Sequence, residues 1–179
     1  MSPRLPSSPS WCAPWSSALS AALLLALGCG APDESAPPGL GLELRLSQAV
    51  ASEVGSFQVA VLAGGRSRNC GELQRTCLNQ QVRTEELLRI AGADKRPVRA
   101  LRFTAALTGS APLSQPVSAD IPVGRDYVVI IEALSRTSPP RFLGSSCNYL
   151  DSVSATGNQP LFANAISLTA VDCDPTLAP

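Results

Sequence analysis

Apolar and polar residues alternate with a period of two along much of this chain, which is the pattern of a β-strand with one buried face. In residues 40–46 the alternation is strict, because leucine occupies every second position. The same period appears in three further segments, residues 57–61, 101–107 and 117–121. Each of these segments therefore predicts a half-buried strand.

Residues 127–134 show a different pattern, a nearly continuous apolar run rich in β-branched side chains. Such a run is typical of a central strand with both faces covered. Two shorter strands are predicted at residues 142–147 and 161–168, and Pro139-Pro140 marks the turn that follows the central strand. About seven strands separated by turn residues predict an all-β domain, a single β-sandwich.

Two intervals interrupt the strand pattern. Residues 64–81 are polar and contain two cysteines, which predicts a loop. Residues 84–91 fit one short helix, with Thr84 as the N-cap and acidic residues in the first turn. The same residues also fit a strand, because Leu88 and Ile90 share one face at a period of two. Of the two, we expect the helix.

A stretch of ten mostly apolar residues, 18–27, precedes the dipeptide Gly28-Cys29. It is too short for a transmembrane helix, which needs about 20 apolar residues, but it suits the apolar core of a signal peptide. A Pro-rich segment with two acids follows at residues 30–39. This order resembles a bacterial lipoprotein signal peptide, and the resemblance implies cleavage before Cys29 and attachment of lipid to its thiol.

The resemblance also implies an organisation and a location. Because Gly30, and not an aspartate, follows Cys29, the sorting rule of well-studied envelopes favours a lipid-anchored protein of the cell envelope, at the outer membrane of a Gram-negative bacterium. Its first partner would be the lipid bilayer, through acylated Cys29. Ordinary cleavage after a small residue is the alternative, and it would give a soluble secreted domain. The expected parts are a signal peptide at 1–28, lipidated Cys29 and a flexible tether at 29–39, a β-sandwich domain at 40–174 and a C-terminal tail at 175–179.

The chain has six cysteines and no histidine. Cleavage would remove Cys12 and lipid would occupy Cys29, which leaves an even number in the exported domain: Cys70, Cys77, Cys147 and Cys173. An oxidising compartment favours two disulfides over zinc, and no C-x2-C spacing is present to suggest a zinc site. Four cysteines allow three pairings, of which we expect the local one, Cys70–Cys77 with Cys147–Cys173.

Composition argues against several functions. Fourteen basic residues balance fourteen acidic residues, so the chain offers no positive field for nucleic acid. Both tryptophans, Trp11 and Trp15, lie in the signal segment, which leaves four Phe and two Tyr for the mature domain. Stacking sites for glycans or single-stranded nucleic acid rely on exposed aromatic side chains. We expect these few aromatic residues to be used in the core.

Catalytic motifs are missing from the sequence. Without histidine there is no Ser-His-Asp or Cys-His machinery, and the single lysine has no serine three residues before it. Asp172 and Asp174 share one side of an extended segment and, with Asp120, Asp126 or Asp151, could ligate Ca²⁺. Because no dense acidic loop is present, we expect solvated surface acids, no metal site, no cofactor and no catalytic residue.

The segment from Asp120 to Ala133, Asp-Ile-Pro-Val-Gly-Arg-Asp-Tyr-Val-Val-Ile-Ile-Glu-Ala, resembles a recurring segment of small transthyretin-like and carboxypeptidase-regulatory-like β-sandwiches. In that resemblance Gly124 makes a tight turn and Tyr127 begins the strand that follows. The resemblance implies a sandwich that anchors, spaces or binds, and it implies no active site.

These observations favour a membrane-anchored envelope lipoprotein with a non-enzymatic binding or structural role. Its second partner would be an unknown envelope protein or surface ligand, bound through loops such as residues 64–81 and 148–160. Two alternatives stay open. One is a soluble secreted β-sandwich binding module, and the other is an envelope hydrolase or inhibitor module that uses the carboxylates of Asp172 or Asp174.

Overall fold

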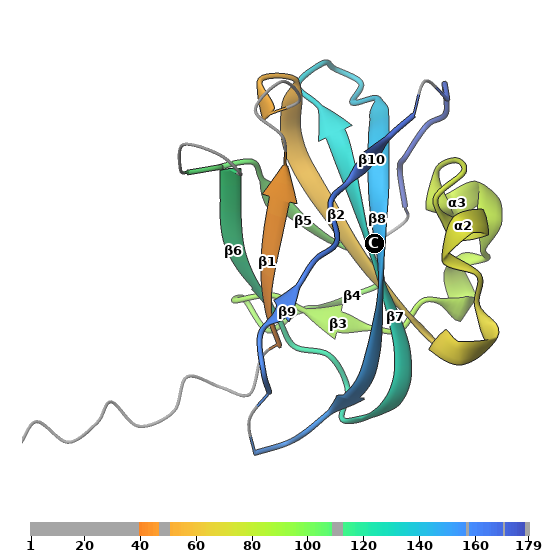
Figure 1. Cartoon of the computed structure of the whole chain (residues 1–179), viewed down its shortest axis with the longest axis vertical. Helices are drawn as coiled ribbons and strands as arrows, with labels where there is room; N and C mark the ends of the chain where they lie inside the picture. Colours follow the sequence, from red (N-terminus) through yellow and green to blue (C-terminus); the bar gives the residue numbers. More distant parts are fainter. Residues whose placement is uncertain (1–39, 47–50, 109–112, 157, 170, 178–179) are drawn as a thin grey trace, which may run out of the picture. The chain divides into compact units, whose positions relative to one another are not determined.

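The computed structural model describes residues 40–46, 51–108, 113–156, 158–169 and 171–177, and strands dominate these residues (Figure 1). Two α-helical turns and two 3₁₀ turns interrupt them: η1 (Gly65–Ser67), α2 (Cys70–Leu73), α3 (Leu78–Gln81) and η2 (Thr84–Glu86). The strands are β1 (Leu40–Leu46), β2 (Val54–Ala63), β3 (Ile90–Ala91), β4 (Pro97–Val98), β5 (Leu101–Thr104), β6 (Leu113–Ala119), β7 (Gly124–Ser135), β8 (Phe142–Val153), β9 (Leu161–Phe162) and β10 (Ser167–Leu168).

The strands form two main sheets and a small hairpin. The first sheet has the order β6-β1-β9 and the second the order β10-β8-β7-β2-β5, while β3 pairs with β4 alone. All pairings are antiparallel except that of β1 with β9. The all-β fold and its two disulfides are therefore confirmed, with more strands than the sequence predicts and with β2, β7 and β8 longer than predicted.

The core lies between the two main sheets. The leucines of β1 face one way as predicted, and all of them are buried against alternate residues of β2 and β7, including Phe57, Val59, Val129 and Ile131. Because apolar side chains from both inner faces interdigitate there, the sheets form a sandwich. Figure 1 shows β6, β1 and β9 as one layer beside the larger sheet.

A second layer covers the outer face of the larger sheet. We call residues 65–81, which contain η1, α2 and α3, the helical cap. Leu73 and Leu78 of the cap pack on Leu62 of β2 and on Val128 and Ile130 of β7. The central strand is therefore covered on both faces, as predicted. The opposite face of β2 is covered as well, so this strand is buried on two faces and not one.

Both disulfides connect the helical cap to other parts of the fold, which makes the expected local pairing wrong. Cys70 is bonded to Cys147 of β8, with Cα atoms 5.5 Å apart, and Cys77 is bonded to Cys173, with Cα atoms 6.1 Å apart. The cap folds down onto the sheet, and α2 packs directly against β8. Each cysteine of the cap thereby comes within disulfide range of a residue far away in the sequence.

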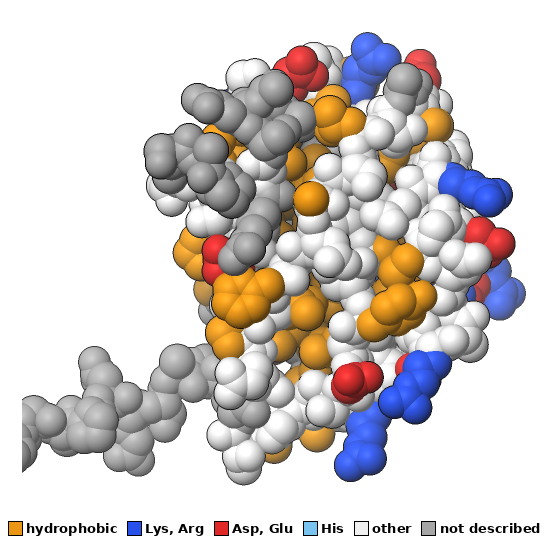
Figure 2. Space-filling view, viewed as in Figure 1, with side chains coloured by type: hydrophobic (Ala, Val, Ile, Leu, Met, Phe, Trp, Pro, Cys, Tyr) orange, Lys and Arg blue, Asp and Glu red, His pale blue; other side chains and the backbone are white. Residues whose placement is uncertain are grey.

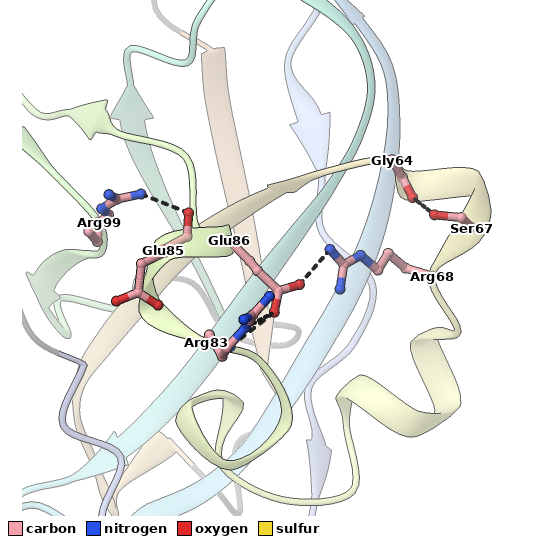
Figure 3. A network of polar contacts seen from close by, with 7 residues as sticks. All are labelled: Gly64, Ser67, Arg68, Arg83, Glu85, Glu86 and Arg99. Atoms are coloured by element: carbon pink, nitrogen blue, oxygen red, sulfur yellow. Dashed lines mark hydrogen bonds and ion pairs between the residues drawn. The ribbon is translucent and has the colours of Figure 1, made fainter.

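The short helix expected at 84–91 is reduced to one 3₁₀ turn, and its N-cap is Arg83 instead of the predicted Thr84. Only the 3₁₀ turn η2 forms there, and its last residue, Glu86, accepts hydrogen bonds from the backbone N–H of Arg83 and from the side chains of Arg68 and Arg83 (Figure 3). The chain then pairs with β2, where Leu88 donates its N–H to the carbonyl of Val61 at 2.8 Å. Beyond η2 the segment is therefore extended: it makes one isolated bridge with β2, between Leu87 and Leu62, and then enters β3, which pairs with β4.

Near the C-terminal end, the predicted strand 161–168 is divided between the two sheets. The chain crosses from β9 in one sheet to β10 in the other, and Asn164 fixes the crossing. Its N–H donates to Oδ1 of Asn148 at 2.7 Å and its side-chain amide donates to the carbonyl of Cys147 at 2.9 Å. Both acceptors lie on β8, which is twelve residues long and continues well past the predicted end at 147.

The residues after Cys173 pack onto the helix-covered side. Pro175 and Leu177 belong to the segment predicted as a C-terminal tail, and both are buried. The predictions for the signal peptide, Cys12, Cys29 and the tether fall on residues 1–39 and lie outside the described residues. Among the described residues, the helices are too short to cross a membrane.

Candidate functional site

Four predicted site residues are cysteines, and the structure places them in disulfides. Cys77, Cys147 and Cys173 are buried, and Cys70 is half-buried beside them. Their role is to hold the helical cap and the C-terminal segment on the larger sheet, since thiolate chemistry requires an unbonded sulfur.

The aspartates proposed as calcium ligands lie in separate places. Lys95 pairs with Asp120 at 2.6 Å, and Asp126 accepts the backbone N–H of Arg66 at 2.8 Å. Near the C-terminal end, Asp172 pairs with Arg141 at 3.6 Å. No group of three potential metal ligands occurs among the residues that the structure describes. The structure does not assemble a calcium site from these acids.

Asp174, the other carboxylate considered for acid–base chemistry, makes a local contact. Its Oδ1 accepts the backbone N–H of Thr176 at 2.9 Å. Hydrogen bonds from Thr176 lower the pKa of Asp174. A carboxyl group held in its ionised form accepts hydrogen bonds well but is a poor proton donor near neutral pH.

A row of polar side chains crosses the larger sheet beneath the helical cap. Arg102 of β5, Gln58 of β2, Glu132 of β7 and Ser145 of β8 are register partners on four neighbouring strands. All but Arg102 are buried, and Glu132 is only 1 % exposed. Sequence reasoning missed this row, because Glu132 lies in an apolar run and Gln58 occupies a position expected to face solvent.

The contacts of Glu132 join three parts of the fold. Its Oε1 accepts the backbone N–H of Leu78, the first residue of α3, at 2.8 Å. Its Oε2 accepts Nε2 of Gln58 at 2.8 Å, and the same amide nitrogen donates to the carbonyl of Pro175 at 2.8 Å. Arg102 completes the row by donating to Oε1 of Gln58 at 2.9 Å.

Burial is the main influence on the protonation of Glu132. It raises the pKa of the carboxyl group, because a desolvated carboxylate is unfavourable, while the N–H of Leu78, the amide of Gln58 and the charge of Arg102 oppose this effect. A raised pKa can indicate an active site when the group lines a cleft. Glu132 is instead closed off from solvent by the helical cap. The polar row therefore has a structural role: it holds the cap and the C-terminal segment on the larger sheet.

An open groove of about 560 Å³ lies at the end of the sandwich where β7 turns into β8. We call it the distal groove; its lining includes Glu53, Arg136, Arg141, Phe142, Thr169 and Val171. Two hydrogen bonds connect Arg136 to the residues before β2: its backbone N–H donates to the carbonyl of Glu53, and its side-chain Nε donates to the carbonyl of Ser52. The volume falls in the range of small-molecule and peptide sites.

The distal groove mixes charges and apolar atoms in a way that suits binding. Two guanidinium groups and a carboxylate can orient a polar ligand, and the side chains of Phe142 and Val171 can exclude water from it. The ion pair of Arg141 with Asp172 is long and mostly exposed, so Arg141 can exchange this partner for a ligand at little cost.

The distal groove lies at the far end of the domain from the start of β1. Leu40 is the register partner of Ala119, and the chain runs from Ala119 into the start of β7. The groove is at the other end of β7, twelve residues away. At about 3.3 Å per residue, that strand spans roughly 40 Å.

Two of the aromatic residues expected in the core are instead largely exposed. Tyr149 is 53 % and Phe162 is 57 % exposed. Tyr149 lines a smaller hollow with Arg66, Asp126 and Asp151, and its hydroxyl donates to the carbonyl of Arg68 at 2.8 Å. Hydrophobic side chains reach the surface at several separate places on the face shown in Figure 2.

Comparisons with protein-family models, with curated proteins and with solved structures found no match for this chain. We therefore describe the class of this protein by its fold alone. The protein is a β-sandwich whose larger sheet carries a helical cap attached by two disulfides.

Proposed function

We propose that this protein is a membrane-anchored envelope lipoprotein with a non-enzymatic binding or structural role. Lipid on Cys29 attaches the chain to the bilayer, residues 30–39 form the tether, and the sandwich is presented beyond it. The observation that carries the proposal is the short apolar run that ends in Gly28-Cys29, eleven residues before the first strand.

The disulfides support export. Removal of Cys12 and lipidation of Cys29 leave four cysteines, and all four are paired in the fold. Disulfides form and persist in oxidising compartments and are rare in the bacterial cytosol.

The site geometry supports binding over catalysis. The carboxylates considered for acid–base chemistry make ion pairs or cap turns, and Glu132 is closed off from solvent. The distal groove is open and lies at the end of the sandwich away from the tether. It is the surface that an anchored domain would offer to a partner in the envelope.

Lipid labelling tests the anchor. Cells that produce the protein are grown with radiolabelled palmitate, with and without globomycin, which blocks the lipoprotein signal peptidase. The wild-type protein should carry label and accumulate as a larger precursor with globomycin. Cys29→Ser should abolish the label, whereas Cys12→Ser, a matched change in the same segment, should leave it unchanged. Label that persists in Cys29→Ser would refute the anchor, and a processed but unlabelled wild-type protein would make the domain a soluble secreted module.

Photo-crosslinking in cells tests the binding role. A photoreactive residue replaces Glu53 in the distal groove or, as a control, exposed Glu85 in η2, outside the groove and outside the loops 64–81 and 148–160. We expect a discrete adduct from position 53 and none from position 85. Identical patterns from the two positions would show that the groove is not the binding surface.

A further inference from the structure

Basic and apolar side chains gather at the end of the domain where β1 begins and the tether would enter. Leu40 pairs with Ala119, and the next residue, Asp120, makes two backbone hydrogen bonds with Ala91 of the β3–β4 hairpin. The hairpin and the turn at residues 120–123 therefore lie beside the start of β1. We call Arg89, Lys95, Arg96, Pro122, Val123 and Arg125 the tether-side surface.

Cations outnumber acids on this surface. Its four basic residues are accompanied by two carboxylates, Asp94 and Asp120, and Asp120 is paired with Lys95 at 2.6 Å. The side chains of Arg89, Arg96 and Arg125 have no hydrogen-bond or ion-pair partner among the described residues. All three are exposed. They leave three guanidinium groups available to an anionic surface.

An apolar tip projects beside these cations. Val123 is 65 % exposed, the largest exposure among the large hydrophobic side chains described, and the neighbouring Pro122 is exposed too. Val123 lines one shallow hollow of about 330 Å³ with Arg89 and Pro97, and Pro97 follows Arg96 in the chain. An exposed apolar side chain among arginines is the combination that membrane-surface segments use, with the apolar group in the interface and the cations at the headgroups.

Three other charged residues lie close to Arg125 in the chain or in the fold: Arg66, Asp126 and Asp151. Arg66 lies 3.9 Å from Asp151, and its backbone N–H donates to Asp126. One negative charge is left over from this group, which is smaller than the surplus of two positive charges on the tether-side surface. These residues line a separate hollow with Tyr149. The excess of positive charge therefore belongs to the tether-side surface.

We propose that the tether-side surface docks on anionic phospholipid headgroups, with Val123 inserted among them; this proposal rests on the lipid anchor at Cys29. Ten residues, 30–39, separate Cys29 from Leu40, so even a fully extended tether reaches only about 40 Å. The anchor keeps the tether-side surface close to the bilayer, where each basic side chain is attracted to a negative leaflet. Docking would orient the sandwich with the distal groove pointing away from the membrane.

Tryptophan fluorescence provides the test, because both native tryptophans lie in the signal segment and the processed chain contains none. Val123→Trp is produced as the full, lipidated protein and reconstituted into vesicles of brominated phosphatidylglycerol or brominated phosphatidylcholine. Val171→Trp, in the distal groove and 36 % exposed in the native residue, is the control. Bromine quenches only an indole that lies at or in the bilayer.

We expect strong quenching and a blue shift for Trp at position 123 in phosphatidylglycerol, weak quenching in phosphatidylcholine, and none for position 171 in either. Replacing Arg89, Arg96 and Arg125 together by Gln in the Val123→Trp protein should reduce quenching to the phosphatidylcholine level. Arg75→Gln removes another exposed arginine, from the helical cap, and should change nothing.

The outcomes separate this proposal from the anchor. If palmitate labels Cys29 but position 123 is not quenched, or is quenched equally in both lipids, the docking surface is wrong and the anchor stands. Quenching that survives the triple substitution would also overturn the role of the arginines. If Cys29 carries no lipid, the anchor fails and this proposal fails with it.

Discussion

At the scale of single residues, Glu132 explains how a polar helical cap can sit on an apolar sheet. A buried carboxylate is costly unless it is hydrogen-bonded. Here each oxygen accepts one bond, from Leu78 in the cap and from Gln58 on the neighbouring strand. Gln58 in turn holds the carbonyl of Pro175. One desolvated group therefore fixes the position of the cap and of the C-terminal segment.

The raised pKa of Glu132 predicts a pH dependence. The folded protein binds a proton at this group above the ordinary pKa of 4.5, where the unfolded chain has released it. The stability contributed by Glu132 is thus complete below that value and is lost as pH rises through the folded pKa. We expect the unfolding free energy of the wild type, minus that of Glu132→Gln, to fall as pH rises from 4 to 8.

Urea unfolding at several pH values measures this difference. Glu86 and Asp174 have lowered pKa values and the opposite pH dependence, but both are present in the two proteins and cancel. Glu72→Gln, an exposed change in the same cap, should give a curve parallel to the wild type. A constant difference between wild type and Glu132→Gln would contradict the desolvation of this carboxyl group.

Gly65 offers a second residue-scale prediction. A Cβ atom at this position would collide with the carbonyl of Tyr127, whose carbon lies 2.7 Å away. Gly65→Ala should therefore destabilise the domain by about 1–3 kcal/mol, as overpacking does. At Gly41 the nearest atom would be 3.8 Å from the new Cβ, so Gly41→Ala should cost less than about 0.5 kcal/mol. Equal effects of the two substitutions in urea unfolding would rule out close packing of η1 on β7.

At the scale of elements, the disulfides compensate for the shortness of the cap helices. Each helix has four residues, far fewer than an isolated helix needs. The bonds Cys70–Cys147 and Cys77–Cys173 close loops of 77 and 96 residues. Constraining loops of this length removes considerable entropy from the unfolded chain.

Removing one disulfide should show this contribution. Cys77→Ser combined with Cys173→Ser should lower the unfolding free energy by about 2–5 kcal/mol. Peptide mapping of the non-reduced wild type should recover Cys70 linked to Cys147 and Cys77 linked to Cys173. Recovery of a Cys70–Cys77 peptide would contradict the placement of the cap.

The sequence predicts the strands far better than the cap. The alternating leucines of β1 and the apolar run of β7 are signals that a buried sheet produces directly. The cap has no such signal, because helices of four residues contain about one turn and show no period. Its position depends on Cys147, Cys173 and Glu132, which are distant in the chain. The distal groove is likewise formed by residues from separate elements, so no local motif reveals it.

At the scale of the whole molecule, the two ends of the described domain differ in their surfaces: one is basic with an exposed valine, and the other carries the distal groove. Arg89, Arg96 and Val123 lie where the tether enters, and the distal groove lies at the other end of β7. A lipid at Cys29 would orient the domain, with the tether-side surface toward the bilayer and the distal groove toward a partner. The same domain without lipid would have no fixed orientation.

Mass spectrometry of the N-terminal peptide, from protein extracted with detergent from the cell envelope, tests the anchored domain most directly. We predict a chain that begins at Cys29 and carries acyl groups on that residue, in a protein whose other four cysteines are all oxidised. An unmodified N-terminus at any residue, or an intact segment 1–28, would contradict the lipid anchor.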